Sequence, residues 1–258
     1  MTGRVRRIMA TSGGFRPTSR WGVAEPGATI RAALALTGQE RPRVCFVLTA
    51  SGDDPTYLSR MYSAFRGWSV DLAHLSLFPQ PNTDPAELLL SQHLIWVGGG
   101  SVSNLLAVWR VHGVDEVMRQ AWEEGVVLAG VSAGSICWHV GGPTDSFGPT
   151  LALEARGLGL LPFGNGVHYD SEDQRRPALH SLVAGGALPT SYATDDGVGL
   201  LYEGTDAVEV FADRPGQDCD AADGPGQPGG QDGPAAYRVE LGSAGTVTET
   251  RLAVGRVR

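Results

Sequence analysis

The sequence predicts an α/β protein in which a mainly parallel sheet lies between layers of helices. Three observations support this class: short apolar runs alternate with longer amphipathic segments, several of the runs are β-branched, and no internal repeat interrupts the pattern. The chain has 258 residues, which is long enough for one large domain with a substantial core. We therefore expect a single three-layer α/β domain over residues 1–258.

Five apolar runs before residue 140 are the expected strands of the sheet. They span residues 6–13, 43–51, 70–78, 93–100 and 126–132. Amphipathic segments between these runs are the expected helices, at residues 27–38, 55–67, 84–92 and 101–125. Because open sheets of this kind bind ligands at the carboxyl ends of their strands, we expect functional residues just after the apolar runs.

Beyond residue 140 the pattern changes to turns and short strands, which predicts a C-terminal β-hairpin region. Four segments have the character of strands, at residues 197–204, 207–214, 236–242 and 246–255. Residues 215–235, between the second and the third, are rich in Gly, Pro, Asp and Gln and lack any large apolar side chain. Such a segment cannot bury enough surface to offset its ordering entropy, so we expect a disordered hairpin loop there.

The composition argues against several classes of protein. The net charge is −8 and all 20 basic residues are arginine, whereas binding of nucleic-acid phosphates needs a concentrated basic face. No apolar run approaches the roughly 18 residues of a membrane span. Three scattered cysteines, Cys45, Cys137 and Cys219, do not form a disulfide framework or a metal site. We expect a cytoplasmic protein with no nucleic-acid or membrane partner, no metal and no cofactor.

The segment LAGVSAGSICWHV, residues 128–140, places the pattern Gly-x-Ser-x-Gly where a strand is expected to end and a helix to begin. At such a junction the serine occupies a tight turn with its hydroxyl exposed, and the helix directs its first amides towards a developing oxyanion. Ser132 is therefore a candidate nucleophile. The alternative interpretation is a helix N-cap flanked by glycines for close packing. Cys137 lies about 140° further around the helix and is expected in the core.

Three consecutive glycines, Gly98 to Gly100, follow the apolar run at residues 93–100. Backbone N–H groups in such a loop are not obstructed by side chains, so the loop is a candidate oxyanion hole. The alternatives are a flexible turn or a phosphate-binding loop. The Walker lysine and the spacing of a dinucleotide fingerprint are both missing, which favours the oxyanion interpretation.

A serine nucleophile needs a base, and histidine suits neutral pH. His168 lies in a polar, glycine-bearing stretch typical of active-site loops, although a lone histidine is often structural. The other histidines fall in expected strands or helices: His74, His93, His112, His139 and His180. The acid that orients the base stays open. Asp145 lies in a turn-rich segment that either folds back over Ser132 or only forms a turn. Its competitors are Asp170, Glu172, Asp195 and Asp196.

Several motifs in this order resemble the serine peptidase family that contains peptidase E, the aspartyl dipeptidase, and cyanophycinase. They are WVGGGSVSNLLAVWR, GVSAGSICW, TDSFGP, GLGLLP and HYDSEDQRR. The resemblance runs from about residue 6 to residue 212. It implies a flavodoxin-like fold of the class I glutamine amidotransferase type, with serine in place of the amidotransferase cysteine.

The resemblance also implies a catalytic triad. Ser132 resembles the nucleophile, His168 the general base and Asp145 the third member. The implied oxyanion hole consists of the backbone amides of Gly99 or Gly100 and Ala133. The activity implied is that of a serine exopeptidase, a dipeptidase that cleaves dipeptides or short peptides through an acyl-enzyme, as a monomer or homodimer.

Aspartyl-specific relatives carry an arginine after the catalytic histidine that binds the aspartate of the substrate. Alignment of the QRR end of this segment places Glu172 at that position, with Arg175 and Arg176 three and four residues later. These three residues are the candidate substrate-binding residues, but a glutamate cannot replace bidentate carboxylate recognition by arginine. The arginines also fit the start of a solvated helix, paired with Glu172 or Asp173. The alternative functions are cyanophycinase-like or specialised amide hydrolysis, or a non-catalytic binding module with an amidotransferase-like fold.

Overall fold

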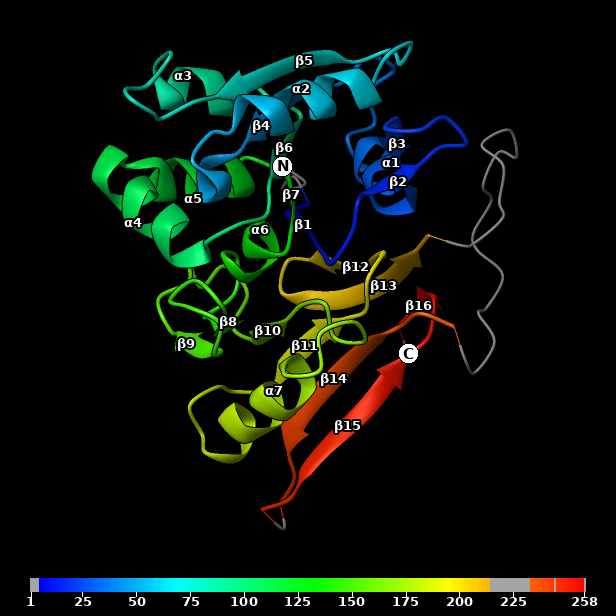
Figure 1. Cartoon of the computed structure of the whole chain (residues 1–258), viewed down its shortest axis with the longest axis vertical. Coiled ribbons are helices and arrows are strands. Elements are labelled where there is room, and N and C mark those ends of the chain that lie inside the picture. Colours follow the sequence, from blue (N-terminus) through cyan, green and yellow to red (C-terminus); the bar gives the residue numbers. More distant parts are fainter. Residues whose placement is uncertain (1–4, 214–232, 244, 258) are drawn as a thin grey trace.

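A computed structural model of the chain describes residues 5–213, 233–243 and 245–257. Its largest element is an eight-stranded sheet with the strand order β16-β13-β12-β1-β7-β6-β4-β5 (Figure 1). Five strands form its parallel part: β1 (Arg7–Thr11), β7 (Val127–Val131), β6 (Leu94–Val97), β4 (Arg43–Val47) and β5 (Asp71–Leu75). These are the five strands predicted from the sequence, each somewhat shorter than its apolar run.

Three antiparallel strands extend the sheet beyond β1. They are β12 (Val198–Glu203), β13 (Asp206–Ala212) and β16 (Gly255–Arg256). A small hairpin precedes the first helix and consists of β2 (Phe15–Pro17) and β3 (Ala24–Pro26). The predicted α/β class with a mainly parallel sheet is confirmed.

Side chains alternate along the parallel strands between two cores, one on each face of the sheet. In β4, Val44 and Phe46 lie in one core, and Cys45 and Val47 lie in the other. The first of these cores is covered by α1 (Ala28–Leu36) and α2 (Pro55–Ala64). The second is covered by α3 (Pro85–Leu90), α4 (Val102–His112), α5 (Val114–Glu123) and α6 (Ala133–Ile136). The molecule therefore has the three layers expected.

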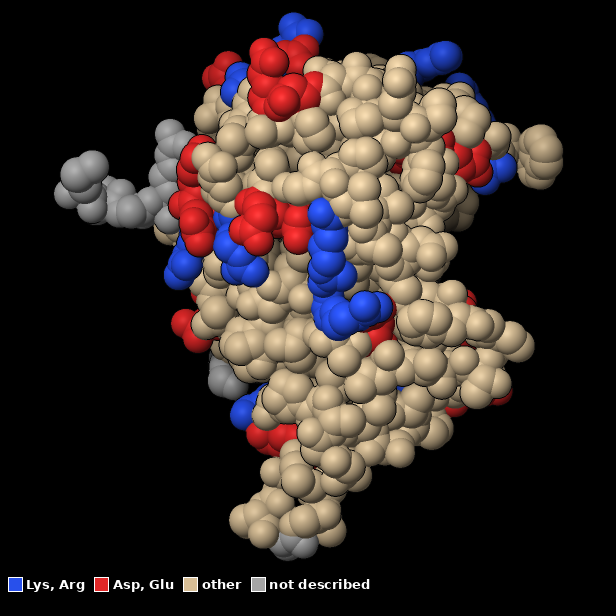
Figure 2. Space-filling view, turned by 90° about the vertical axis from the view of Figure 1, so that its left-hand side faces the viewer, with Lys and Arg blue, Asp and Glu red and all other residues tan. Residues whose placement is uncertain are grey.

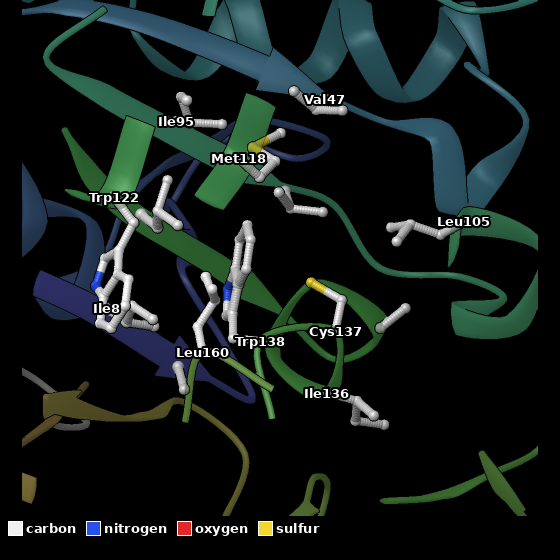
Figure 3. Close-up of a cluster of buried hydrophobic side chains, with 14 of the residues drawn as sticks. Ile8, Val47, Ile95, Leu105, Met118, Trp122, Ile136, Cys137, Trp138 and Leu160 are labelled. Carbon is white, nitrogen blue, oxygen red and sulfur yellow. The ribbon is translucent and has the colours of Figure 1, made fainter. Parts of the chain in front are cut away.

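Figure 3 shows the second core. Trp138 lies at its centre, among Met118, Trp122, Ile95 and Leu160, and all of these side chains are at most 5% exposed. A buried aromatic residue of this size removes a large apolar area from water and contacts several elements at once. The core thus joins α5, the sheet and the segment that follows α6.

The helices begin where the sequence carries capping residues. The side chains of Asp54, Asp84 and Ser101 each accept a hydrogen bond from a backbone N–H in the first turn of α2, α3 and α4. A proline follows each of the two aspartates, at the position where its missing N–H costs least. These local signals explain why the starts of these helices were predicted closely.

Two helix predictions were wrong. The helix expected over residues 101–125 is divided into α4 and α5 at Gly113, which has φ 69° and ends α4 in the left-handed conformation. The helix expected after Ser132 ends at Ile136, so His139 lies beyond it. The carbonyl groups of residues 137–139, which would accept hydrogen bonds from a longer α6, accept instead from the N–H groups of residues 158, 159 and 161. Leu158 N, for example, donates to Cys137 O at 2.8 Å. Cys137 is fully buried, as predicted.

A second sheet lies below the central sheet in Figure 1 and has the order β10-β11-β14-β15. Its strands are β10 (Gly164–Gly166), β11 (Ser191–Thr194), β14 (Ala236–Leu241) and β15 (Val247–Leu252). The helix α7 (Arg175–Ala184) packs against it. Between α6 and this sheet lies a two-stranded sheet of β8 (Gly142–Thr144) and β9 (Ala152–Glu154).

The C-terminal hairpins predicted from the sequence are present, but their partners differ from the prediction. β12 pairs with β13 in the central sheet, and β14 pairs with β15 in the second sheet. The segment 215–235 therefore connects two different sheets and is not a hairpin loop. Of that segment, residues 215–232, including Cys219, lie outside the described residues.

The surface carries both signs of charge. On the face shown in Figure 2, arginine side chains lie among acidic ones, and most of the face carries neither. Within the described ranges no helix combines the length and apolar character needed to cross a membrane. The same part of the chain contains no group of three or more His, Cys, Asp or Glu side chains arranged to hold a metal ion.

Candidate active site

Ser132 stands between the end of β7 and the start of α6, as the sequence predicted. Its backbone has φ 56° and ψ −111°, a strained conformation for a residue with a side chain. Its N–H donates to Thr11 O at 3.0 Å, and its carbonyl accepts from the N–H groups of Ser135 and Ile136. The residue is partly exposed. These contacts hold the tight turn that a nucleophile elbow requires.

The two glycines of the motif are needed for packing. A Cβ on Gly130 would lie 2.3 Å from Gly134 O, and a Cβ on Gly134 would lie 2.3 Å from Val97 O. Both contacts are with backbone atoms, which cannot move aside cheaply. The glycines therefore let the elbow press against the neighbouring strand β6 and keep Ser132 at the edge of the sheet.

His168 lies just after β10 and also has a left-handed backbone, with φ 52°. Its N–H donates to the side-chain oxygen of Ser12 at 3.0 Å. Ser12 follows Thr11, the residue that holds the N–H of Ser132. Both Ser132 and His168 are thus anchored to consecutive residues at the carboxyl end of β1. Strained backbone of this kind gathers at functional sites, where the surroundings hold it in place.

Asp196 is the carboxylate that contacts the histidine. Its Oδ1 lies 2.6 Å from Nδ1 of His168, and its backbone N–H donates to Asp170 Oδ1 at 2.8 Å. The contact has a topological cause, because β10 and β11 are parallel neighbours and the two residues follow their carboxyl ends. With Nδ1 donating to a carboxylate, Nε2 of the imidazole is the nitrogen left to accept a proton.

Asp145, the predicted third member of the triad, is placed elsewhere. Its side chain is 61% exposed, and its Oδ1 lies 3.9 Å from Nη2 of Arg175. The turn that carries it is tied to α4, since Ser103 N donates to Ser146 Oγ at 3.4 Å. Asp145 also accepts, through its carbonyl, the N–H of Gly148, which fits the alternative interpretation of a turn former. The structure places Asp196, and not Asp145, against the imidazole of His168.

The other candidate acids are also engaged away from the imidazole. Asp195 is 3% exposed, and its Oδ2 accepts from Ala235 N at 2.9 Å and from Tyr237 Oη at 3.1 Å. Burial raises the pKa of Asp195. Glu172 binds Nε of Arg175 at 2.7 Å. The local sequence does not show which of Asp195 and Asp196 contacts the histidine. The choice follows only when residues 191–194 are known to form a strand beside residues 164–166.

The glycine loop lies beside Ser132. A Cβ on Gly99 would lie 3.4 Å from Cβ of Ser132 and 3.9 Å from its Oγ. Gly100 has φ 136°, and a Cβ there would lie 2.3 Å from Ala50 O. In the described part of the chain, no backbone carbonyl accepts a hydrogen bond from the N–H of Gly100 or of Ala133. Gly99 of the loop expected to form an oxyanion hole therefore lies close to the hydroxyl of Ser132.

Tyr57 on α2 supports this loop and was not singled out from the sequence. A Cβ on Gly98 would lie 3.2 Å from Cε1 of its ring. Burial raises the pKa of Tyr57, and a contact with the backbone N–H of Gly99 opposes part of that rise. Tyr57 lies 75 residues before Ser132 in the sequence, so only the fold brings it to the glycine loop.

The two arginines expected to bind substrate are engaged by the protein itself. Arg175 is 3% exposed, and besides Glu172 it binds Pro143 O at 3.0 Å. Arg176 forms an ion pair with Glu249 on β15. The pairing of Arg175 with Glu172 agrees with the alternative interpretation of a paired helix start.

The fold and the site define a class: an α/β protein that presents a serine at a strand–helix elbow next to a glycine loop, with a histidine–aspartate pair anchored to the same strand end. The family model described as Peptidase family S51 matches residues 25–210. The chain belongs to this family and is a serine-type peptidase. This confirms the resemblance to the peptidase E family.

A Bacillus subtilis (strain 168) protein called uncharacterized peptidase YgaJ is 43% identical over 183 residues, which are 71% of this chain and 79% of the relative. Two solved structures share the fold at low identity. One, from an acI-B1 Actinobacterium, is a peptidase with a TM-score of 0.66 and 14% identity, and the match covers 98% of each chain. The other is a candidate peptidase E of Listeria monocytogenes EGD-e, with a TM-score of 0.57 and 16% identity over 81% of this chain and 98% of that one.

Proposed function

We propose that the chain hydrolyses the peptide bonds of dipeptides or short peptides through an acyl-enzyme formed on Ser132. The single observation that carries this proposal is the 2.6 Å contact between His168 Nδ1 and Asp196 Oδ1, on a loop anchored beside the elbow. Such a pair holds the imidazole in the tautomer and orientation of a general base.

The reaction follows from these groups. Nε2 of His168 takes the proton of the Ser132 hydroxyl, and the oxygen attacks the scissile carbonyl to form a tetrahedral intermediate. The backbone N–H groups of Ala133 and of Gly99 or Gly100 stabilise its oxyanion. The imidazolium then gives its proton to the leaving amine as the carbon–nitrogen bond breaks. Water, deprotonated by the same imidazole, releases the acid and restores the serine.

Labelling with an active-site-directed fluorophosphonate tests the proposal. We expect one mole of label on Ser132 of the wild-type protein, and neither labelling nor peptide cleavage in Ser132→Ala. Ser59→Ala, on the exposed face of α2, is the matched control and should behave as wild type. A wild-type protein that takes no label, or a Ser132→Ala variant that still cleaves peptides, would remove the proposal.

The arginine contacts also bear on the substrate. We propose that the enzyme does not require an aspartate in its substrate, because the guanidinium of Arg175 is buried and already bound by Glu172 and Pro143 O. Glu172 and Asp145, with side chains 45% and 61% exposed, add negative charge that opposes an acidic residue. A panel of α- and β-aspartyl dipeptides, other dipeptides and branched Asp-Arg substrates should show no preference for the aspartyl members. Selective cleavage of aspartyl dipeptides would contradict this, and turnover of the branched substrates alone would indicate cyanophycinase-like activity.

A further inference from the structure

A cluster of aromatic and charged side chains fills the space between α7 and the second sheet, outside the groups that react. It consists of Arg176, Glu249, Tyr169, Tyr237 and Asp195 and is called here the Arg176 cluster. Its members come from α7, from the loop after β10, from the end of β11, and from β14 and β15, which lie together in Figure 1. The proposed mechanism uses none of them.

Glu249 gathers the donors of this cluster. Its Oε2 accepts from Tyr169 Oη at 2.8 Å and lies 2.8 Å from Nε2 of His180, and its Oε1 binds Arg176. The Glu249 side chain is only 20% exposed, so these contacts are partly shielded from water. Burial raises the pKa of Tyr169, and the neighbouring Glu249 raises it further, so the phenol remains a donor.

The guanidinium of Arg176 lies over two rings. Its central carbon is 4.3 Å from the ring centroid of Tyr169 and 4.6 Å from that of Tyr237. The two rings are themselves in contact, with centroids 5.3 Å apart. A planar cation held over aromatic faces and bound by a carboxylate is a geometry that arginine makes and lysine does not.

The Arg176 cluster includes the residue next to His168 in the sequence, Tyr169, and the residue next to Asp196, Asp195. Tyr169 follows His168, and its backbone N–H donates to Thr194 O at 3.2 Å. Tyr237 donates to Asp195, the residue before Asp196, at 3.1 Å. Arg176 contacts the rings of both tyrosines and therefore joins the two loops through their buried neighbours.

We propose that Arg176 is a positioning residue for the hydrolytic reaction: through Tyr169 and Tyr237 it fixes the two loops that bring His168 and Asp196 together. The inference rests on the proposed function. It assigns to Arg176 a role different from the substrate contact expected from the sequence, since its guanidinium already binds Glu249 and lies over the rings of Tyr169 and Tyr237.

The pair needs such support. The side chains of His168 and Asp196 are 22% and 49% exposed and come from two separate loops, so their contact depends on how those two loops are held relative to each other. Displacement of a reacting group by about 1 Å costs on the order of 10²-fold in rate. Loosening either loop should therefore lower the rate of the chemical step and leave substrate binding almost unchanged.

Arg176→Gln is the test, with Arg238→Gln as the matched control. Arg238 pairs with Glu240 on β14 of the same sheet and does not belong to the cluster. We expect Arg176→Gln to lower kcat by roughly 10- to 100-fold for every peptide cleaved, with KM within about 2-fold of wild type. Fluorophosphonate labelling of Ser132 should slow by a similar factor, and Arg176→Lys should recover only part of the rate. Arg238→Gln should match wild type in all of these measurements.

A double-mutant cycle with Asp196→Asn separates positioning from a general loss of structure. If Arg176 acts through the pair, Arg176→Gln should slow labelling much less in the Asp196→Asn background than in wild type, whereas independent effects multiply. Circular dichroism and thermal melting are used to check that each variant is folded at the assay temperature. Should Arg176→Gln not fold, Tyr237→Phe removes only the hydroxyl that holds Asp195 and takes its place in the cycle.

Three results would overturn the inference: labelling and kcat equal to wild type, a rise in KM confined to one class of peptide, or fully multiplicative effects in the cycle. Failure of the proposed function is distinct, because the wild-type protein would then take no label at all.

Discussion

The central sheet and the second sheet supply the site in different ways. Ser132 comes from the central sheet, in one continuous strand, turn and helix whose glycines are spaced for that purpose. His168 and Asp196 follow two strands of the second sheet, which are three and four residues long. The two side chains are in contact although 28 positions separate them in the sequence. The position of the candidate nucleophile is set by its local sequence, whereas the positions of the proposed base and its carboxylate depend on the pairing of remote segments.

The largest expected effect tests which of two carboxylates, Asp196 or Asp145, orients the imidazole of His168. Asp196→Asn should lower kcat/KM by about 10⁴-fold, because an amide at this position favours the wrong tautomer of the imidazole. Asp145→Asn, the matched change at an exposed ion pair of 3.9 Å, should stay within about 3-fold of wild type. Steady-state cleavage of a dipeptide and fluorophosphonate labelling measure both. A large loss in Asp145→Asn and a small one in Asp196→Asn would reverse the assignment made from the geometry.

This contrast also explains what the sequence could predict. The five parallel strands, the elbow at Ser132 and the glycine loop carry strong local patterns, and all are where they were expected. His168 lies in a loop, as expected, whereas the carboxylate that it contacts is not the one expected. The two short strands that align His168 with Asp196 contain GNG and SYAT, which have no apolar periodicity. Their pairing is set by contacts across the sheet, and sequence reasoning from local patterns does not detect such contacts.

The next effect concerns the central sheet. Gly100→Ala should lower kcat by about 10²- to 10³-fold, because a Cβ 2.3 Å from Ala50 O displaces the loop that we propose as an oxyanion donor. Gly113→Ala is the matched control, since Gly113 also has a positive φ but a Cβ there meets nothing within 4 Å. The control should lose about 1–2 kcal/mol of stability in thermal melts and keep its kcat. If both variants keep kcat, the glycine loop does not serve the oxyanion.

A third prediction concerns the junction of the two sheets. His139 is fully buried, with Nδ1 2.9 Å from Ser135 O and its ring against Tyr202 of β12. Tyr202 in turn contacts Tyr192 of β11, so this group joins the central sheet to the second. Burial lowers the pKa of His139 to about 4 from an ordinary value of 6.5.

The sign of the resulting pH dependence follows from proton binding. Below about pH 6.5 the unfolded chain binds a proton at His139 that the folded protein does not accept until about pH 4. The free energy of unfolding should therefore fall by roughly 3 kcal/mol from pH 7 to pH 4 on account of this residue. Urea unfolding of wild type and His139→Phe at several pH values measures the difference between their slopes. Parallel curves for the two proteins would show that His139 does not contribute.

The smallest expected effect concerns the central sheet alone. It measures how far the conformation of the glycine loop depends on Tyr57, a residue outside the local motif. Tyr57→Phe keeps the ring against Gly98 and removes only the hydroxyl near the N–H of Gly99. Loss of one hydrogen bond in this position should lower kcat by roughly 2- to 10-fold without changing KM. Tyr62→Phe, on the same helix, removes a hydroxyl that contacts Nδ1 of His74 at 3.0 Å and should leave kcat unchanged. Equal kcat values for the two variants would mean that the loop holds its shape through its own glycines and the contact of Gly100 with Ala50 alone.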